Sequence, residues 1–333
     1  MSKNPSSITT EFVGCDLCGS EDQELLYSKI DRFTGQEFHL VECSCGMAFV
    51  NPMPTEESIP FLYPDDYLKD KSFMEPLYRR MTGYLPWNGT GRLLDVGCGR
   101  GDFIQFASTL GWEGEGVDLL DWGSPHNLPI RVGDFLEMDL PERSYDAVTA
   151  WALIEHVRKP SDYFAKVSSL LTDDGHFVFV VPNFGAPGMR HSCTEDIPRH
   201  LHLFTSRAID AYLGAYDMRV QKLYHSSALY TAYPFGLLRY GILRLLGGQT
   251  LCSRYENRSV ALLRGRQIRG NLLSWLKEVV STVSSIDMIV DAFDLGLGIA
   301  VAETSKLVGN YGVITVIAVP NRQKKSNPIE EDC

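Results

Sequence analysis

The stretch LLDVGCGRGDF, residues 93–103, constrains the fold more than any other part of the sequence. Its leucines read as the end of a buried strand, and glycine then stands at every second position, at Gly97, Gly99 and Gly101. From Phe103 onward apolar residues recur at helical spacing until Gly111 ends the helix. The segment therefore predicts a strand, a tight glycine turn and a helix, which is a ligand-binding turn at the edge of an α/β sheet.

Two common nucleotide-binding loops do not fit this turn. The dinucleotide fingerprint needs a third glycine where Asp102 stands, and the phosphate-cradling loop needs a lysine that is absent here. The turn carries Asp95 instead, and a carboxylate repels a pyrophosphate but suits a cationic amine. Free N–H groups at the start of the following helix can hold a carboxylate. The pattern therefore predicts a ligand with an amino acid group.

Later segments add strands that end beside acidic residues. Residues 111–120 read as a second strand that ends in Asp118, and an acid at this place binds a ribose diol in folds of this kind. The stretch RVGDFLEMD then supplies Asp134 and Phe135, and 144–157 and 170–183 hold two further strands. This run, from about 91 to 230 with a last strand at 311–319, resembles class I S-adenosylmethionine-dependent methyltransferases.

The resemblance implies an α/β, Rossmann-like sheet that is mostly parallel, with an antiparallel last strand. It implies S-adenosylmethionine as cofactor, with Asp134 at the adenine amino group and a neighbouring apolar residue over the ring. The predicted cofactor-binding residues are Asp95, Gly97, Gly99, Gly101, Asp118, Asp134, Phe135 and Ala150. The family usually has a helix after the second strand, but Gly123, Pro125 and Pro129 predict that 119–131 forms no full helix here.

Four of the eight cysteines are clustered near the N-terminus, namely Cys15, Cys18, Cys43 and Cys45. Four thiolates at tetrahedral reach favour Zn²⁺, and a glycine after each pair leaves N–H groups free to bond sulfur. The second pair is Cys-x-Cys, so either a tighter turn is tolerated or one thiolate binds poorly. The alternative is a set of buried cysteines without metal. We expect a small zinc ribbon, because about 40 residues cannot bury enough core to fold without such a ligand.

The segment after the ribbon is rich in proline and reads as a stiff connector. Ribbon and connector resemble a zinc-binding segment found ahead of bacterial methyltransferases that are often encoded with sugar and polysaccharide pathways. The predicted division is a ribbon at 1–51, a linker and helix at 52–90, a methyltransferase domain at 91–230 plus 311–320, a helical insertion at 231–310 and a polar tail at 321–333.

Methyl transfer to a hydroxyl, or to a carbon beside a carbonyl, needs a group that removes a proton. Histidine is suited to this near neutral pH. His156 follows the fourth strand, and His191, His200 and His202 lie in the loop after the fifth. We expect His156 or His200 to be the base, with Glu155 orienting a histidine or acting as base itself. Packing roles for these residues are the alternative, and His200 and His202 should point opposite ways in an extended chain.

The insertion combines an apolar helix at 233–248 with seven arginines between 237 and 269. Three roles stay open for it: a lid over the acceptor site, a homodimer surface, or peripheral membrane contact through 233–269. Further helices are expected at 271–283 and 285–308.

We expect a cytoplasmic enzyme, because the N-terminus is polar and no apolar run reaches the length of a membrane span. The acceptor suggested by the resemblance is a nucleotide-linked or lipid-linked sugar, methylated on oxygen or carbon. An rRNA methyltransferase is a second reading, but the formal charge of −11 disfavours nucleic acid as a partner. A binding protein of the same fold without turnover is the third.

Overall fold

The computed structural model describes residues 8–31, 33–63, 75–86, 90–191, 196–226 and 286–321, with short pieces between 228 and 251. Several predictions lie outside the described residues, namely most of the helix at 233–248 and of the basic segment up to 269, the helix at 271–283 and the tail after 321.

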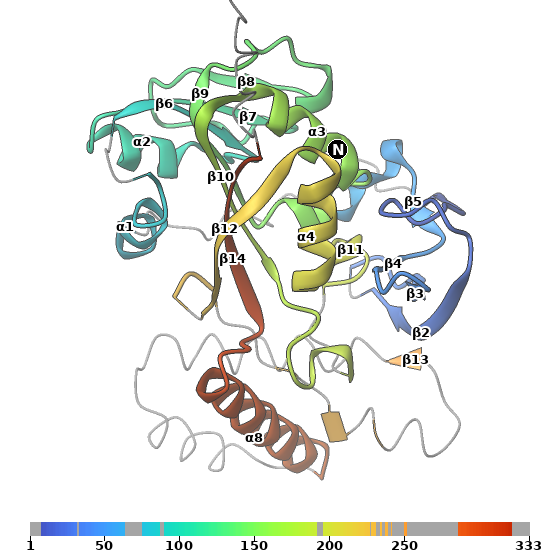
Figure 1. Cartoon of the computed structure of the whole chain (residues 1–333). Coiled ribbons are helices and arrows are strands. Elements are labelled where there is room, and N and C mark those ends of the chain that lie inside the picture. Colours follow the sequence, from blue (N-terminus) through green and yellow to red (C-terminus); the bar gives the residue numbers. More distant parts are fainter. Residues whose placement is uncertain are drawn as a thin grey trace, which may run out of the picture.

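The centre of the molecule is a seven-stranded sheet in the order β12-β14-β10-β9-β6-β7-β8 (Figure 1). Its strands are β6 (Gly91–Val96), β7 (Trp112–Asp118), β8 (Ile130–Val132), β9 (Tyr145–Trp151), β10 (Leu171–Pro182), β12 (Met218–His225) and β14 (Val313–Pro320). Neighbours run parallel except β14, which is antiparallel to both β10 and β12. The predicted mostly parallel sheet with an antiparallel last strand is confirmed.

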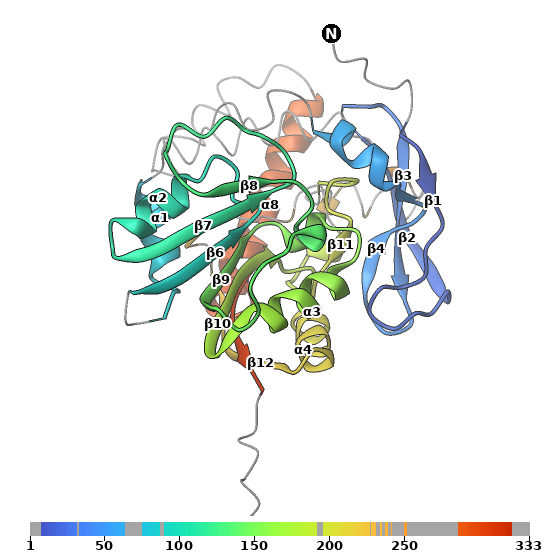
Figure 2. The same ribbon diagram turned by 90° about the horizontal axis from the view of Figure 1, so that it is seen from above.

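Helices cover both faces of this sheet, as the view from above shows (Figure 2). Along β6 and β10 successive apolar side chains alternate between two cores, since neighbouring residues of a strand point to opposite faces. α1 (Glu75–Thr82), α2 (Asp102–Ser108) and α8 (Ile286–Leu307) pack on one face, and α3 (Pro160–Leu170) and α4 (Ser206–Ala215) on the other. α8 matches the helix expected at 285–308.

Short 3-10 turns complete the connections: η1 (Glu56–Leu62), η2 (Phe135–Glu137), η3 (Ile154–His156) and η4 (Met189–His191). In the described part of the chain, no helix combines the length and apolar character that crossing a membrane requires.

A second sheet lies beside α3 and α4, in the order β11-β4-β3-β2-β13 (Figure 1). β2 (Gln23–Ile30), β3 (Glu37–Cys43) and β4 (Ala48–Val50) form its centre, and β1 (Thr10–Glu11) pairs with β5 (Met53–Pro54) next to it. Its edges are β11 (His202–Leu203), from the loop after β10, and β13 (Thr250–Leu251), from the insertion. The sheet is therefore not closed within the predicted ribbon at 1–51, although the domain division itself stays a prediction.

The two sheets are joined by a shared core and by polar contacts. Side chains of β3 and β4 pack in one hydrophobic cluster with α3, α4 and one face of the central sheet. Asp16, beside the first cysteine, accepts hydrogen bonds from the backbone N–H and hydroxyl of Ser161, at 2.9 and 2.7 Å, and from the Tyr212 hydroxyl at 2.9 Å. Because Ser161 is in the first turn of α3, Asp16 also satisfies a free N–H group of that helix.

Candidate functional site

The glycine turn joins β6 to α2 at the carboxyl ends of the parallel strands. The turn has three glycines with positive φ angles, namely Gly97 (73°), Gly99 (56°) and Gly101 (80°). Residues that carry a side chain rarely adopt this backbone conformation. A Cβ on Gly97 would meet Leu153 at 2.9 Å, and one on Gly101 would meet Ile130 at 2.7 Å. A Cβ on Gly99 would have no neighbour within 4 Å, so a ligand can approach the backbone at this position.

Asp95 lies at the end of β6, only 3% exposed. Its Oδ1 accepts a hydrogen bond of 2.6 Å from the hydroxyl of Thr149 on β9. Burial raises the pKa of Asp95 to about 8, the charge of Asp118 adds to this, and the bond from Thr149 opposes it. A cation placed beside this carboxyl would offset the cost of ionising it, which fits the predicted amine of the ligand.

Asp118 ends β7 next to the turn and uses both of its oxygens. Oδ2 accepts from the N–H of Gly99 at 2.8 Å. Oδ1 accepts from the N–H of Leu120 at 3.0 Å and from the indole N–H of Trp122 at 2.9 Å. The segment 119–129 contains no helix, as its glycine and prolines predict.

Two further predicted cofactor residues flank the start of η2. Asp134 caps this turn, since its Oδ1 accepts from the N–H of Leu136 at 2.9 Å. Phe135 is 3% exposed, with its ring against Tyr163 and the ammonium of Lys166 5.0 Å from its centre. The ring of Phe135 therefore packs in the core, and its predicted contact with the adenine stays a prediction. The last predicted cofactor residue, Ala150, is buried within β9.

The predicted catalytic residues Glu155, His156 and His200 come together, with one ligand atom of each within 4.8 Å of the others. The first two belong to η3, and His200 belongs to the loop after β10. A backbone hydrogen bond from Leu201 N–H to the Glu155 carbonyl, 2.7 Å, joins the two segments. The rings of His156 and His200 meet edge to face with centres 4.8 Å apart. This cluster can take up a proton, or another cation, between its carboxylate and its two imidazoles.

His156 is oriented by two neighbours from distant parts of the chain. Its Nδ1 lies 2.9 Å from the carbonyl of Arg199 and 3.1 Å from the hydroxyl of Tyr63. Since a carbonyl only accepts, we assign the proton to Nδ1, which leaves a lone pair on Nε2. Nε2 is 3.9 Å from the Glu155 carboxylate, and burial together with nearby His200 lowers the pKa of His156 to about 3.

His202 has a packing role. It is 1% exposed, its Nδ1 lies 3.1 Å from the Val157 carbonyl, and its ring stacks on Phe49 of β4. His200 and His202 thus face different surroundings, as their alternation predicts. The side chain of His191 lies outside the described residues.

Sequence reasoning missed Arg199, which anchors the loop that carries His200. Its side chain is fully buried and forms ion pairs with Asp31, 2.7 Å away in the N-terminal sheet, and with Asp196 at 2.6 Å. It also donates to the carbonyl of Leu62. The neighbouring histidines and proline gave no sign of this, because Asp31 is 168 positions away in the chain.

The four clustered cysteines converge in the structure. The sulfurs of Cys15 and Cys45 are 3.7 Å apart, those of Cys18 and Cys43 are 3.5 Å apart, and all four lie within 4.8 Å of one another. Metal–sulfur bonds of about 2.3 Å in a tetrahedron place sulfurs about 3.8 Å apart. The Cys-x-Cys pair fits this spacing because it lies in the turn between β3 and β4, where Gly46 takes a φ of 91°.

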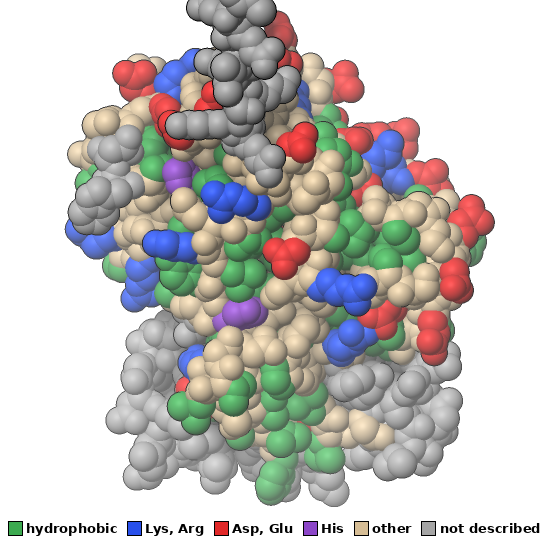
Figure 3. All heavy atoms as spheres, viewed as in Figure 1, with side chains coloured by type: hydrophobic (Ala, Val, Ile, Leu, Met, Phe, Trp, Pro, Cys, Tyr) green, Lys and Arg blue, Asp and Glu red, His purple; other side chains and the backbone are tan. Residues whose placement is uncertain are grey.

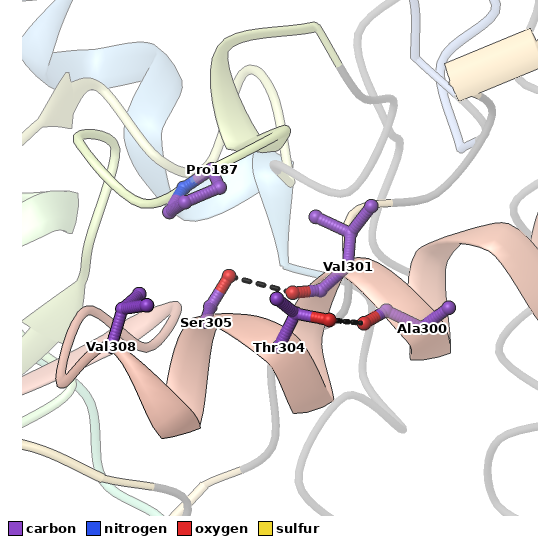
Figure 4. A pocket seen from close by; sticks show the side chains of 6 residues that line it. All are labelled: Pro187, Ala300, Val301, Thr304, Ser305 and Val308. Atoms are coloured by element: carbon purple, nitrogen blue, oxygen red, sulfur yellow. Dashed lines mark hydrogen bonds between the residues drawn. The ribbon is translucent and has the colours of Figure 1, made fainter.

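A separate pocket of about 350 Å³ lies between α8 and Pro187 (Figure 4). The hydroxyls of Thr304 and Ser305 point along the helix and donate to the carbonyls of Ala300 and Val301. The remainder of its lining is apolar, so the pocket offers little for chemistry and we place the site at the glycine turn and the histidine cluster.

Parts of the chain are similar to known methyltransferases. The family model described as a methyltransferase domain matches residues 69–223, which include the glycine turn, Glu155 and His200. Residues 69–223 are therefore similar to a methyltransferase domain. Ubiquinone biosynthesis O-methyltransferases of Proteus mirabilis and Photobacterium profundum are 32% and 26% identical to it over 104 and 107 residues, each 28% of this chain.

The chain spans less than half the length of these two relatives, 42% and 45%. A probable S-adenosylmethionine-dependent methyltransferase of Mycolicibacterium smegmatis is 27% identical over 139 residues, 40% of this chain and 52% of that protein. Among solved structures, a SAM-dependent methyltransferase from Archaeoglobus fulgidus matches 77% of this chain and 100% of its own, with 17% identity and a TM-score of 0.46.

Proposed function

We propose that this protein transfers a methyl group from S-adenosylmethionine to a small-molecule acceptor, by in-line displacement at the edge of the central sheet. The observation that carries the proposal is the meeting of two features at this edge. The open backbone at Gly99 lies beside Asp95 and Asp118, and the cluster of Glu155, His156 and His200 lies at the end of the neighbouring strand β9.

The glycine turn with Asp95, Asp118 and Asp134 forms the cofactor half of the proposed site. In it Asp95 would hold the amine of the methionine end, Asp118 the ribose hydroxyls and Asp134 the adenine. Gly97 and Gly101 keep the turn tight, since neighbouring side chains fill the space above them. The cofactor supplies a methyl group on a cationic sulfur, which makes the methyl carbon an electrophile. Residues of the chain then have to align the acceptor and remove its proton.

The cluster of Glu155, His156 and His200 forms the acceptor half of the proposed site and removes that proton. The Nδ1 proton of His156 faces the Arg199 carbonyl, so the lone pair is on Nε2, the nitrogen 3.9 Å from the Glu155 carboxylate. A low pKa makes His156 a weak base by itself, so we assign proton removal to His200 and the alignment of its ring to His156. Glu155 then stabilises the imidazolium that forms.

We also propose that the four cysteines hold Zn²⁺ and that this site braces the acceptor half. Their sulfur spacing matches a tetrahedral site. The N-terminal sheet, which holds these cysteines, has two links to the loop that carries His200. Its strand β4 pairs with β11, and its Asp31 forms an ion pair with Arg199.

The acceptor class is a nucleotide-linked or lipid-linked sugar, which the resemblance of ribbon and connector suggests. An RNA acceptor is disfavoured by charge. Within the described part of residues 8–63 the basic side chain is Lys29, which is buried, whereas acidic side chains are exposed at Glu11, Glu21, Asp22, Glu24, Glu37, Glu56 and Glu57. Acidic side chains are also prominent over this sheet on the molecular surface (Figure 3). Such a face repels the long phosphate backbone of an RNA.

The test is a turnover assay of the zinc-loaded full chain with methyl-labelled S-adenosylmethionine and a panel of nucleotide sugars, lipid-linked sugars and structured RNA. We expect labelled methyl groups in a sugar product and stoichiometric S-adenosylhomocysteine. Labelling of RNA would replace the acceptor class. Tight cofactor binding without any product across the panel would favour a binding protein of this fold.

A further inference from the structure

The segment 119–129, which stands where related domains carry a helix, is bonded to the glycine turn along its length. The hydroxyl of Ser124 donates to the Arg100 carbonyl at 2.8 Å. His126 Nε2 lies 2.7 Å from the Asp102 carboxylate at the start of α2. Leu128, with Ile130 of β8, lies over Gly101. The segment therefore forms a strap across the turn, fixed at its middle and at its far end.

At the near end of the strap, Trp122 bonds Asp118, the residue to which the proposed function assigns the ribose hydroxyls. Its indole N–H donates to Oδ1 at 2.9 Å, while Oδ2 is already used by Gly99. A carboxylate has about four acceptor positions, of which backbone N–H groups here take two and the indole takes a third. One position remains free, so a ribose diol that offers two hydroxyls needs the position that the indole takes.

The two backbone bonds of Asp118 belong to the architecture of the turn and orient the carboxylate. The indole bond is different, because Trp122 is a partly exposed side chain on a loop and can rotate away without disturbing β7 or the turn. Replacing this bond by one from a ligand hydroxyl exchanges one donor for another, so it leaves no buried charge unsatisfied. The freed indole then has an apolar face beside the nucleoside.

We propose that Trp122 holds the Asp118 carboxylate in the free protein and yields this hydrogen bond to a ribose hydroxyl when a nucleoside-containing cofactor binds. Trp122 is then a specificity-determining residue for the ribose diol, because only a ligand that supplies a hydroxyl can displace the indole without loss. The inference rests on the proposed use of S-adenosylmethionine, and it deepens it by naming the competitor for the ribose site.

The test compares Trp122→Phe with the wild type by calorimetric titration, using S-adenosylhomocysteine and its 2′,3′-dideoxy analogue. Phenylalanine keeps an aromatic ring and removes the competing donor. A net hydrogen bond to a charged group corresponds to roughly a tenfold change in affinity, so we expect the variant to bind S-adenosylhomocysteine about three- to tenfold tighter. The dideoxy analogue should bind the wild type worst, and the variant should recover part of that loss.

Trp112→Phe is the matched control, since Trp112 is buried at the opposite end of the same strand. Its affinity for S-adenosylhomocysteine should equal that of the wild type. Tryptophan fluorescence gives an independent readout: titration should shift the emission of the wild type and of Trp112→Phe, and the shift should vanish in Trp122→Phe.

Two results would overturn the inference, and they are distinguishable. If S-adenosylhomocysteine binds the wild type and Trp122→Phe equally, with the same fluorescence shift, then Trp122 does not compete and only this inference fails. If the wild type binds no S-adenosylhomocysteine at all, the proposed function fails with it.

Discussion

Two histidine–carboxylate pairs lie at the same edge of the central sheet, and they differ in what their Nε2 atoms reach. In the cofactor half, Nε2 of His126 is 2.7 Å from Asp102, a direct hydrogen bond that ties a loop down. In the acceptor half, Nε2 of His156 is 3.9 Å from Glu155, too far for a hydrogen bond. The first pair is therefore joined by a direct hydrogen bond, and the second is not.

The surroundings of the two pairs explain this difference. His126 and Asp102 are 20% and 16% exposed, so water can share in their bonding. Glu155 is 2% exposed and His156 is 16% exposed, and the Arg199 carbonyl and the Tyr63 hydroxyl hold Nδ1 of His156. The same residue types thus give a direct hydrogen bond in one place and, in the other, a more widely spaced pair with a buried carboxylate beside His200.

The largest effect is expected from removal of the metal site, which should abolish methyl transfer but leave cofactor binding in place. Cys15→Ser, or zinc removal by a chelator, should release the N-terminal sheet and with it β11 and the Asp31–Arg199 pair, so methyl transfer should fall to background. The hydrogen bonds described for Asp95 and Asp118 come from Thr149, Gly99, Leu120 and Trp122, which lie outside that sheet. Calorimetry should therefore still show S-adenosylhomocysteine binding within about threefold of the wild type, a range set by the accuracy of additivity between distant sites.

Loss of both activity and cofactor binding would instead show that the N-terminal sheet is needed for the whole fold. Full activity without metal would refute its bracing role.

The second prediction compares the proposed base, His200, with the structural histidine, His126. His200→Asn should lower kcat by about 10²- to 10⁴-fold, the usual contribution of a general base, with cofactor affinity unchanged. His126→Asn is the matched control and should leave kcat within about threefold, because that pair only holds a loop. Steady-state kinetics with the acceptor found in the panel checks both, and equal losses in the two variants would contradict the assignment of roles.

The third prediction concerns the buried anchor of the acceptor half. Asp31→Asn leaves the Arg199 charge in the core without its partner in the N-terminal sheet, so the free energy of unfolding should fall by about 3 kcal/mol. The control is Glu75→Gln, which breaks a pair with Arg79 that is 51% and 70% exposed and should cost less than about 0.5 kcal/mol. Urea unfolding measures both free energies. Similar small losses of stability in the two variants would show that Arg199 does not anchor the loop.

The last prediction concerns how the affinity for S-adenosylhomocysteine depends on pH. Because burial holds the pKa of Asp95 at about 8 in the free protein, the carboxyl is mostly protonated at neutral pH and must ionise to meet a cationic amine. Binding then releases a proton below pH 8, so affinity for S-adenosylhomocysteine should rise up to about tenfold per pH unit from pH 6 to 8 and level off above. Calorimetry of the wild type at several pH values measures this, and an affinity that stays constant from pH 6 to 8 would contradict it.

The cofactor half could be predicted largely from the sequence, because its signals are local. Glycines at every second position, an acid before them and an acid at the next strand end lie within 26 residues, from 93 to 118, and each has a physical meaning by itself. Even there, two features were out of reach. The burial of Phe135 beneath Tyr163 and Lys166, and the bond between Trp122 and Asp118, depend on side-chain packing that spacing does not reveal.

The acceptor half could be predicted only as a set of candidate histidines. His156, His200 and His202 look alike in sequence, and what distinguishes them is contact with distant segments. His202 stacks on Phe49, whereas His156 is held by Tyr63 and by the Arg199 carbonyl. These contacts join residues more than 40 positions apart, so neither charge pattern nor periodicity indicates them.

The central claim is tested most directly by calorimetric titration of the zinc-loaded full chain with S-adenosylhomocysteine, alongside Asp95→Ala. The account predicts micromolar binding by the wild type and its loss in the variant, because the alanine removes the carboxyl that meets the amine. No binding by the wild type, or equal binding by both proteins, would contradict it.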